Sequence, residues 1–316
     1  MGTDSRSRGS RLPDPQAFRF GRNTVVRPTI FVQANDRQMV GARIAAFSFR
    51  RNSRTPDAFD VNIMNIRDFP CLMERGQSIL RDGFVRAWDP DDLQSFTPLR
   101  FAPPSLMEFG GRAIVVDPDC FAVGDVVSLL SRDMGGKAIR AVWQQPTSGK
   151  EPRWASSVML LDCAKLRHWD FDRVVAGMFE HDFDYLRWNR LELEDQSTIG
   201  PIEPEWNSFD ALGPQTRILH TTRRRTQPLK TGLPVDYTLH ETKPFKFAQL
   251  IRRPRYSKHP DPNQEAFIYS LLAEMIENGL VTRSELRSEM AANHIRHDSL
   301  DLVDRYRGWE LFKEAA

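Results

Sequence analysis

Hydrophobic and polar residues follow one another along the chain in blocks that predict strands and helices in turn. Residues 29–34 (TIFVQA) form a short β-prone run that ends at the polar cluster 35–37 (NDR). Apolar residues then recur at helical spacing over 40–49, and residues 59–64 alternate between apolar and polar as a strand does. This opening predicts a β–α–β unit, which is the usual start of an α/β sheet.

The same succession continues through the middle of the chain. Residues 113–116 (AIVV) predict a buried strand that stops at 117–119 (DPD). A helix, two strands and a longer helix are predicted after it, over residues 126–130, 137–143, 158–161 and about 163–179. Strands that alternate with helices predict a mostly parallel sheet with both faces covered, of the kind that binds nucleotides.

The C-terminal part of the chain has a different pattern. A stretch rich in Pro, Arg and Lys surrounds residues 254–262, and apolar residues at helical spacing follow over 267–276. Thr282 and Glu285 have the spacing of a capping box for a further helix. The chain therefore divides into three predicted parts: a disordered leader (1–24), an α/β domain (25–255), and a linker with a helical extension (256–316).

Composition and charge narrow the class of protein. Of 316 residues, 40% are hydrophobic and 27% are charged, which is typical of a globular protein with a real core. The formal net charge of +2 argues against a nucleic-acid partner held by overall charge. No apolar run approaches the roughly 18 residues of a membrane span. The three cysteines are far apart and odd in number, which predicts reduced thiols and a cytoplasmic protein.

Two carboxylates follow the strand predicted over 113–116. Asp117 and Asp119 stand where that strand ends, and open α/β sheets bind ligands beyond the carboxyl ends of their strands. Hard divalent cations need such oxygen ligands and commonly bridge them to substrate phosphates. The pair therefore indicates a metal site for a diphosphate-bearing substrate, although a polar turn after a strand has the same pattern.

Several segments resemble one known family. Residues 112–125 (RAIVVDPDCFAVGD) resemble the metal-binding segment of glycosyltransferase family 8, which has the GT-A fold and transfers sugars from nucleotide-sugar donors with retention. Four more segments resemble that family in the same order, namely 95–101 (SFTPLRF), 154–162 (WASSVMLLD), 202–207 (IEPEWN) and 218–222 (ILHTT). The resemblance covers roughly residues 28–232 and implies a GT-A-like fold for this part of the chain.

The resemblance implies a set of metal ligands. His220 would join Asp117 and Asp119 around Mn²⁺ or Mg²⁺, since Mn²⁺ accepts mixed nitrogen and oxygen ligands. After His220 the chain departs from the family, because 223–230 (RRRTQPLK) lacks the family's Gly and its Lys-Pro-Trp. The basic residue that would contact donor phosphate is therefore open between the Arg triplet and Lys230, and we take Lys230 as the candidate.

Further donor contacts are expected from two places. Gln33, Asn35 and Arg37 occupy the first β–α loop, where the family contacts the nucleoside, although a plain polar turn explains them equally well. Arg100 corresponds to the family's donor-contacting arginine, with an ordinary surface arginine as the alternative. Asp117 is expected to contribute to donor binding as well as to the metal.

The acceptor side is altered relative to the family. Ala155 replaces the family's Asn, while Ser156 and Ser157 remain as acceptor-side candidates. Two positions match the family's Asp-Gln pair weakly, and of these we prefer Asp184 over Asp195 as the catalytic candidate because of its distance from Asn207. The sequence thus predicts a changed acceptor site beside a retained donor site.

Two groups of residues have open interpretations. Tryptophans could stack on sugars or pack in the core, and this applies to Trp188, Trp206 and Trp309. A basic cluster could give peripheral contact with an anionic membrane or be a solvated linker, and it consists of Arg252, Arg253, Arg255 and Lys258.

Taken together, the sequence predicts a metal-dependent glycosyltransferase of hexosyltransferase type. It would move a sugar from a nucleotide-sugar donor, a UDP-sugar, to a carbohydrate or other hydroxyl acceptor with retention. A nucleotidyltransferase is disfavoured because residues 33–37 contain no glycine for a phosphate loop. A non-catalytic nucleotide-sugar-binding relative or scaffold on the same fold remains an alternative.

Overall fold

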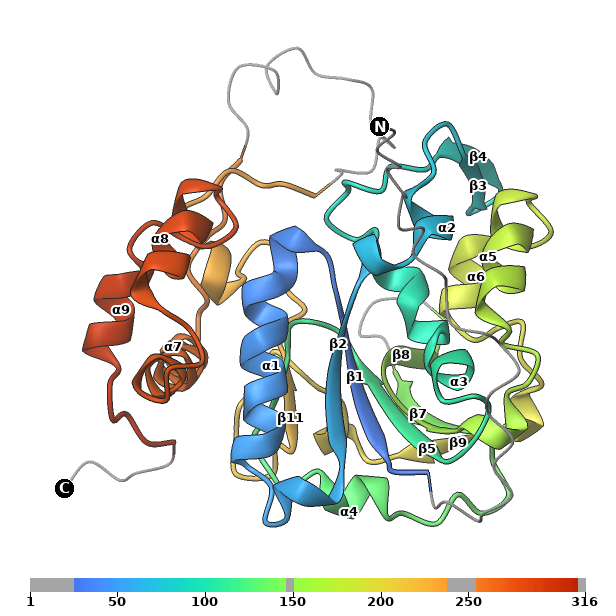
Figure 1. The fold of residues 1–316 in the computed structure, drawn as a ribbon, viewed down its shortest axis with the longest axis horizontal. Helices are drawn as coiled ribbons and strands as arrows, with labels where there is room; N and C mark the ends of the chain where they lie inside the picture. Colours follow the sequence, from blue (N-terminus) through green and yellow to red (C-terminus); the bar gives the residue numbers. More distant parts are fainter. Residues whose placement is uncertain (1–25, 146–150, 238–253, 312–316) are drawn as a thin grey trace, which may run out of the picture.

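The computed structural model describes residues 26–145, 151–237 and 254–311. Its centre is a six-stranded sheet with the order β2-β1-β5-β8-β7-β9 (Figure 1). The strands are β1 (Thr29–Ala34), β2 (Asp60–Asn65), β5 (Arg112–Val116), β7 (Ile139–Gln144), β8 (Arg153–Asp162) and β9 (Ile199–Ile202). Only β8 pairs antiparallel with its neighbours, so five of these six strands share one direction.

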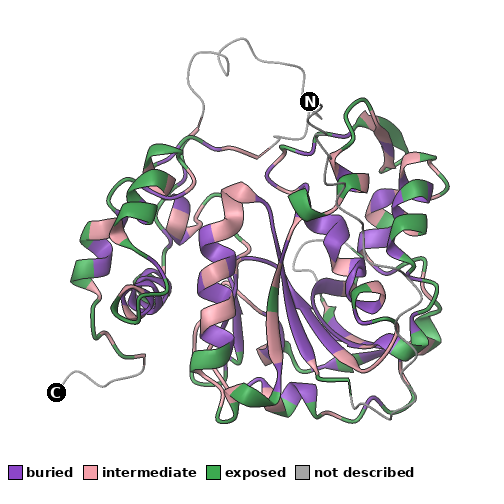
Figure 2. Cartoon of the chain, viewed as in Figure 1, coloured by how far each residue is buried: buried purple, intermediate pink, exposed green. Residues whose placement is uncertain are grey.

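The central strands are mostly buried (Figure 2), and their residues alternate between two cores on opposite faces of the sheet. In β1, Ile30 and Val32 join one core while Phe31 joins the other. In β5, Val116 and Val115 divide in the same way. Because both faces are apolar, the strands read as continuous hydrophobic runs, as expected for a sheet covered on both sides.

One face is covered by α1 (Met39–Arg51) and a small second sheet. That sheet has the order β10-β11-β6, with β6 (Cys120–Ala122), β10 (Ser208–Phe209) and β11 (Ile218–His220). The helix α4 (Val127–Leu130) follows β6. Gly41 of α1 lies against the turn that precedes β6, where an added Cβ would lie 2.8 Å from the carbonyl oxygen of Pro118. Glycine therefore permits this close approach of helix and turn.

Shorter elements cover the other face. They are α2 (Pro70–Met73), α3 (Pro103–Leu106), α5 (Phe171–Phe179), α6 (Tyr185–Asn189) and a hairpin of β3 (Ser78–Arg81) and β4 (Phe84–Ala87). The long helix predicted over about 163–179 is wrong in its first half. The chain forms only a 3-10 turn over Cys163–Lys165, and the helix α5 begins after Asp170. Asp170 caps this helix, because its side chain accepts a hydrogen bond from the backbone N–H of Arg173.

The C-terminal helices pack beside α1 (Figure 1). They are α7 (Pro262–Glu277), α8 (Arg283–Ala291) and α9 (Ser299–Arg305). The capping box of Thr282 and Glu285 at the start of α8 is confirmed. Arg296 forms a buried ion pair with Glu265 of α7 at 2.5 Å, which ties the end of the chain to that helix. Apolar residues of α7 belong to the same core as β1 and α1.

The predicted α/β class is confirmed: a mostly parallel sheet is flanked by helices, and the C-terminal region is helical. The predicted leader (1–24) lies outside the described residues, and so do Arg252 and Arg253 of the predicted basic cluster. No helix among the described residues is long and apolar enough to cross a bilayer. The cytoplasmic location stays a prediction.

Candidate active site

Three segments that are distant in the sequence bring the predicted metal ligands together. Asp117 follows the last residue of β5, and Asp119 precedes β6. β6 pairs antiparallel with β11, and their register sets Cys120 opposite His220. Because directly opposed residues of an antiparallel pair project to the same side, this register carries the imidazole to the turn that holds both aspartates.

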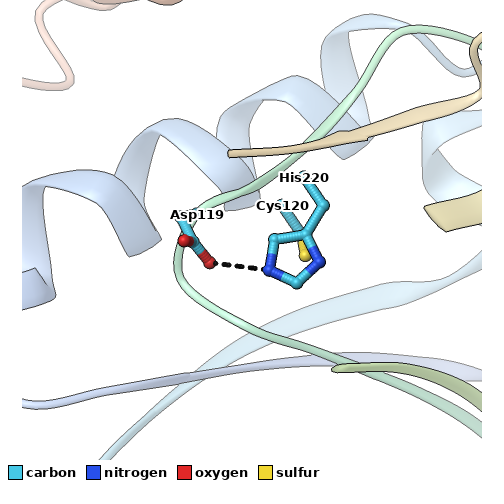
Figure 3. A group of neighbouring side chains, drawn as sticks. All are labelled: Asp119, Cys120 and His220. Atoms are coloured by element: carbon cyan, nitrogen blue, oxygen red, sulfur yellow. Dashed lines mark ion pairs between the residues drawn. The ribbon is translucent and has the colours of Figure 1, made fainter. Parts of the chain in front are cut away.

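The imidazole of His220 faces the carboxylate of Asp119 (Figure 3) and also lies near that of Asp117. Nε2 lies 3.3 Å from Oδ1 of Asp119 and 3.9 Å from Oδ2 of Asp117. The other ring nitrogen, Nδ1, is 2.8 Å from the side-chain oxygen of Asn207, whose amide nitrogen donates to Ser157 Oγ at 3.0 Å. Nδ1–H therefore donates to the amide oxygen of Asn207, and the ring is held with Nε2 facing the aspartates.

This donor set fits a divalent cation. A lone pair on Nε2 cannot bond to a carboxylate oxygen unless a proton or a cation lies between them. Two ligand atoms that share one ion at bonds of about 2.1 Å lie about 3 to 4 Å apart, which matches both distances from Nε2. Carboxylate oxygens with one imidazole nitrogen suit Mn²⁺.

The electrostatics around His220 favour positive charge at this point. Burial by itself lowers the pKa of the imidazole, but Cys120 and Asp119 beside it raise that pKa well above its ordinary value. Burial raises the pKa of Cys120 to about 11. Ligand atoms of Asp119, Cys120 and His220 all lie within 4.8 Å of one another (Figure 3), which makes the sulfur a further neighbour of the site.

Asp117 is held from its other side. Arg100 donates to it with Nε at 3.0 Å and with Nη2 at 2.5 Å, and the amide of Gln33 also donates to Oδ1. Arg100 donates in addition to Ser156 Oγ at 3.0 Å. The guanidinium of Arg100 thus links Asp117 to β8, and its bidentate contact fixes the position of the Asp117 carboxylate.

A cavity of about 690 Å³ opens over these residues. Seven of the residues singled out from the sequence line it, namely Arg100, Asp117, Asp119, Ser156, Ser157, His220 and Lys230. Lys230 comes from a 3-10 turn at Pro228–Lys230, and its Nζ lies 2.9 Å from Asp236. Burial lowers the pKa of this lysine, while Asp236 opposes that shift.

Four other predicted site residues do not line the cavity. Gln33 lies behind Asp117, and Asn35 donates to the backbone of Asp92 and Leu93, so both have supporting positions. Arg37 also lies outside the cavity lining. The fourth is Asp184, which caps α6.

The geometry of Asp184 is that of a structural carboxylate. Its Oδ1 accepts from the backbone N–H of Leu186 at 2.8 Å and of Arg187 at 3.3 Å. Its Oδ2 accepts from the backbone N–H of Gly83 in the β3–β4 turn at 2.9 Å. Burial raises the pKa of Asp184, but these backbone donors outweigh burial and lower it. The structure therefore does not bring the preferred catalytic candidate to the metal-ligand cluster.

The cavity also contains residues that sequence reasoning did not single out for it. Gln227 is one of them and donates to Asp119 at 3.0 Å, whereas Arg224, which also lines the cavity, belongs to the predicted Arg triplet and lies 5.7 Å from the ring centre of Tyr237. Asn189 lines the cavity with a buried side-chain oxygen that has no partner among the described residues. Cys120 reaches His220 only through the β6–β11 register, so no local spacing in the sequence signals it.

The tryptophans and the basic cluster also have defined positions. Trp188 and Trp206 are buried in the two cores, and Trp188 stacks on Phe101. Trp154 is the tryptophan that lines the cavity among the described residues. In the basic cluster, Arg255 forms an isolated β-bridge with Pro234, and its side chain donates to the carbonyl oxygen of Gly232.

Comparison with known proteins gives remote structural similarity only. No protein-family profile and no curated protein matches this sequence. The glycosyltransferase GlyE of Streptococcus pneumoniae TIGR4 is 14% identical with a TM-score of 0.46, covering 64% of this chain and 56% of GlyE. The galactosyltransferase LgtC, solved with donor and acceptor sugar analogs, is 13% identical with a TM-score of 0.44, covering 64% of this chain and 89% of LgtC.

Mouse xyloside xylosyltransferase 1 is 13% identical with a TM-score of 0.42, covering 62% of this chain and 97% of that protein. All three neighbours are glycosyltransferases by name. This chain spans just over half the length of GlyE. Similarity at this level leaves the donor, the acceptor and the metal of this protein open.

Proposed function

We propose that this protein is a metal-dependent glycosyltransferase that moves a hexosyl group from a nucleotide-sugar donor, a UDP-sugar, to an acceptor hydroxyl. The observation that carries the proposal is the meeting of Asp117, Asp119 and His220 in one polar cavity, with Nε2 of the imidazole aimed at both carboxylates. The five segments that resemble glycosyltransferase family 8 in order support the same activity.

The chain's own residues have separable tasks in this reaction. Asn207 fixes the imidazole, and Arg100 fixes Asp117. When bound by the two aspartates and His220, Mn²⁺ or Mg²⁺ would neutralise the charge that grows on the departing diphosphate. Lys230 lines the same cavity, and its ammonium group would stabilise negative charge on a phosphate oxygen of the donor.

In the transfer, the bond between the anomeric carbon and the diphosphate oxygen breaks and a bond to the acceptor oxygen forms. The acceptor's proton leaves with the nucleoside diphosphate. Among the described residues that line the cavity, the carboxylates are Asp117 and Asp119, and both belong to the metal-ligand cluster. With no further carboxylate to serve as a covalent nucleophile, we propose attack from the face that the leaving group vacates, hence retention. NMR of the product's anomeric proton tests this.

Manganese-dependent turnover of UDP-sugars tests the proposal. Asp119→Ala is expected to abolish release of UDP and to leave the melting temperature unchanged, because this side chain is partly exposed at a strand end. Asp57→Ala, which changes an exposed aspartate in the 3-10 turn Pro56–Ala58, is the matched control. Wild-type turnover in Asp119→Ala would overturn the metal assignment.

One observation favours a second candidate, a non-catalytic nucleotide-sugar-binding relative. Both oxygens of Asp117 are already bonded to Arg100, and Gln33 adds a third donor. Release of nucleoside diphosphate from several UDP-sugars in the presence of Mn²⁺ supports the enzyme. UDP-sugar binding that raises the melting temperature without any release supports the binding protein.

A further inference from the structure

The cavity has a second end at which arginines gather. Arg81 is the last residue of β3, Arg153 is the first residue of β8, and Arg190 follows α6; all three line the cavity. The side chain of Arg153 makes no hydrogen bond or ion pair within the part of the chain that the structure describes. Arg81 lies over the ring of Tyr185, 5.4 Å from its centre.

The arginines at this end outnumber the acid beside them. Burial, followed by the facing charge of Arg190, lowers the pKa of Arg153. The nearest acid is Glu192, which lies 3.7 Å from Arg190 and is shared with Arg187. The described cavity lining as a whole carries two acidic and six basic side chains, the latter being Arg81, Arg100, Arg153, Arg190, Arg224 and Lys230. Of these six, Arg100 and Lys230 are paired with Asp117 and Asp236, whereas Arg153 and Arg190 have only Glu192 beside them. Partly buried like charges that face each other are unfavourable unless a ligand supplies further opposite charge.

The arginine end is separate from the metal-ligand end. Ser156 accepts a hydrogen bond from Arg100, which also donates to Asp117. This part of β8 therefore lies next to the predicted metal ligands. Arg153 stands three residues earlier on the same strand, about 10 Å along the backbone at the usual rise of a strand. Neither Arg153 nor Arg190 contacts Asp117, Asp119 or His220 in the described part of the chain, and this difference from Arg100 distinguishes the arginine end from the predicted metal ligands.

An aromatic surface accompanies the arginines. Trp154 follows Arg153, lines the cavity, and packs edge-to-face on Trp143 with ring centres 4.7 Å apart. Its indole nitrogen donates to Gln196 at 2.9 Å, which fixes the ring. A fixed indole beside two guanidinium groups offers one apolar surface to a sugar ring and two forked donors to an acid.

We propose that this end of the cavity is the acceptor subsite and that it selects an anionic acceptor. The acceptor is a sugar or glycan that carries a carboxylate or a phosphate, held by Arg153 and Arg190 while its ring lies on Trp154. The assignment of this subsite to the acceptor rests on the proposed glycosyltransferase function, but binding of an anion at this site can be tested without any sugar transfer.

Isothermal titration calorimetry with glucuronate and glucose 6-phosphate, against neutral glucose, tests the anion site. The wild type is expected to bind at least one of the two anions at least about tenfold more tightly than glucose, the size of effect expected for a charge-assisted contact. Arg153→Gln and Arg190→Gln should each remove this preference, and Arg153→Lys should restore part of it. Arg187→Gln is the control, because Arg187 lies on the same helix with a 61% exposed side chain outside the cavity lining.

Equal or absent binding of the anions and glucose overturns the proposal, and so does a preference that survives Arg153→Gln. UDP is titrated in parallel in the presence of Mn²⁺. Absence of UDP binding would contradict the proposed function but would leave the anion site intact. UDP-glucuronate and UDP-glucose are also compared, in order to decide whether the acid belongs to the donor or to the acceptor. If Arg153→Gln weakens UDP-glucuronate selectively, the acid belongs to the donor sugar and the acceptor assignment is overturned.

Discussion

Nδ1 of His220 lies 2.8 Å from the side-chain oxygen of Asn207, and this contact aims the opposite ring nitrogen at Asp119. Asn207 is itself almost completely buried and is anchored to Ser157. The position of a proposed metal-ligand atom is thus set by a residue that would not itself be a ligand. Such outer contacts fix both the tautomer and the orientation of a ligating histidine.

Asn207→Ala is therefore expected to weaken Mn²⁺ binding by about 10- to 100-fold, although no ligand is removed. The imidazole would be free to rotate and to carry its proton on Nε2. The measurement is the free Mn²⁺ signal in electron paramagnetic resonance across a titration. Asn207→Asp keeps an oxygen for Nδ1 and should retain more affinity than the alanine variant. Equal affinity in wild type and Asn207→Ala would contradict this role.

Asp184→Ala separates a capping carboxylate from a catalytic one. We expect the free energy of unfolding to fall by about 1–2 kcal/mol, because the variant loses the cap of α6 and the bond to Gly83. Turnover of a UDP-sugar by the folded variant should stay within a few-fold of wild type. Urea unfolding and steady-state kinetics give the two values. A thousand-fold loss of kcat with unchanged stability would return Asp184 to the catalytic machinery.

Gly41→Ala tests the close contact between α1 and the turn at Pro118. In a helix this substitution ordinarily stabilises by about 0.5–1 kcal/mol. Here the new Cβ would meet the Pro118 carbonyl oxygen, and overpacking of this kind costs about 1–3 kcal/mol. We expect net destabilisation in urea unfolding, together with weaker Mn²⁺ binding as the aspartate turn shifts. Gly213→Ala, at a position with open space, is the control. A stabilised Gly41→Ala would refute the contact.

The main strands and α1 could be predicted from the sequence because each is set by a local pattern. Continuous apolar runs predicted β1 and β5, and helical spacing predicted α1 within one or two residues. The helix predicted over about 163–179 failed because apolar spacing continues across residues 163–170, while the cap at Asp170 decides where α5 begins. Asp184 carried a similar local signal, an acid immediately before a helical segment, which is typical of a cap.

The candidate site could be predicted only in part, because much of it depends on pairing between distant segments. The approach of His220 to the aspartates agrees with the resemblance to a known family. Cys120 beside His220 and Asn207 behind it follow from the registers of β6, β10 and β11, which no spacing in the sequence specifies. The approach of Arg153 to Arg190 likewise depends on where α6 packs against the end of β8.

Direct titration of Mn²⁺ in the presence of UDP, followed by electron paramagnetic resonance, tests the central claim most directly. The wild type and Asp57→Ala are predicted to bind stoichiometric Mn²⁺, and Asp119→Ala and His220→Gln to bind it at least about tenfold more weakly. The account is contradicted if the wild type leaves all Mn²⁺ free, or if the two site variants bind it as tightly as wild type does.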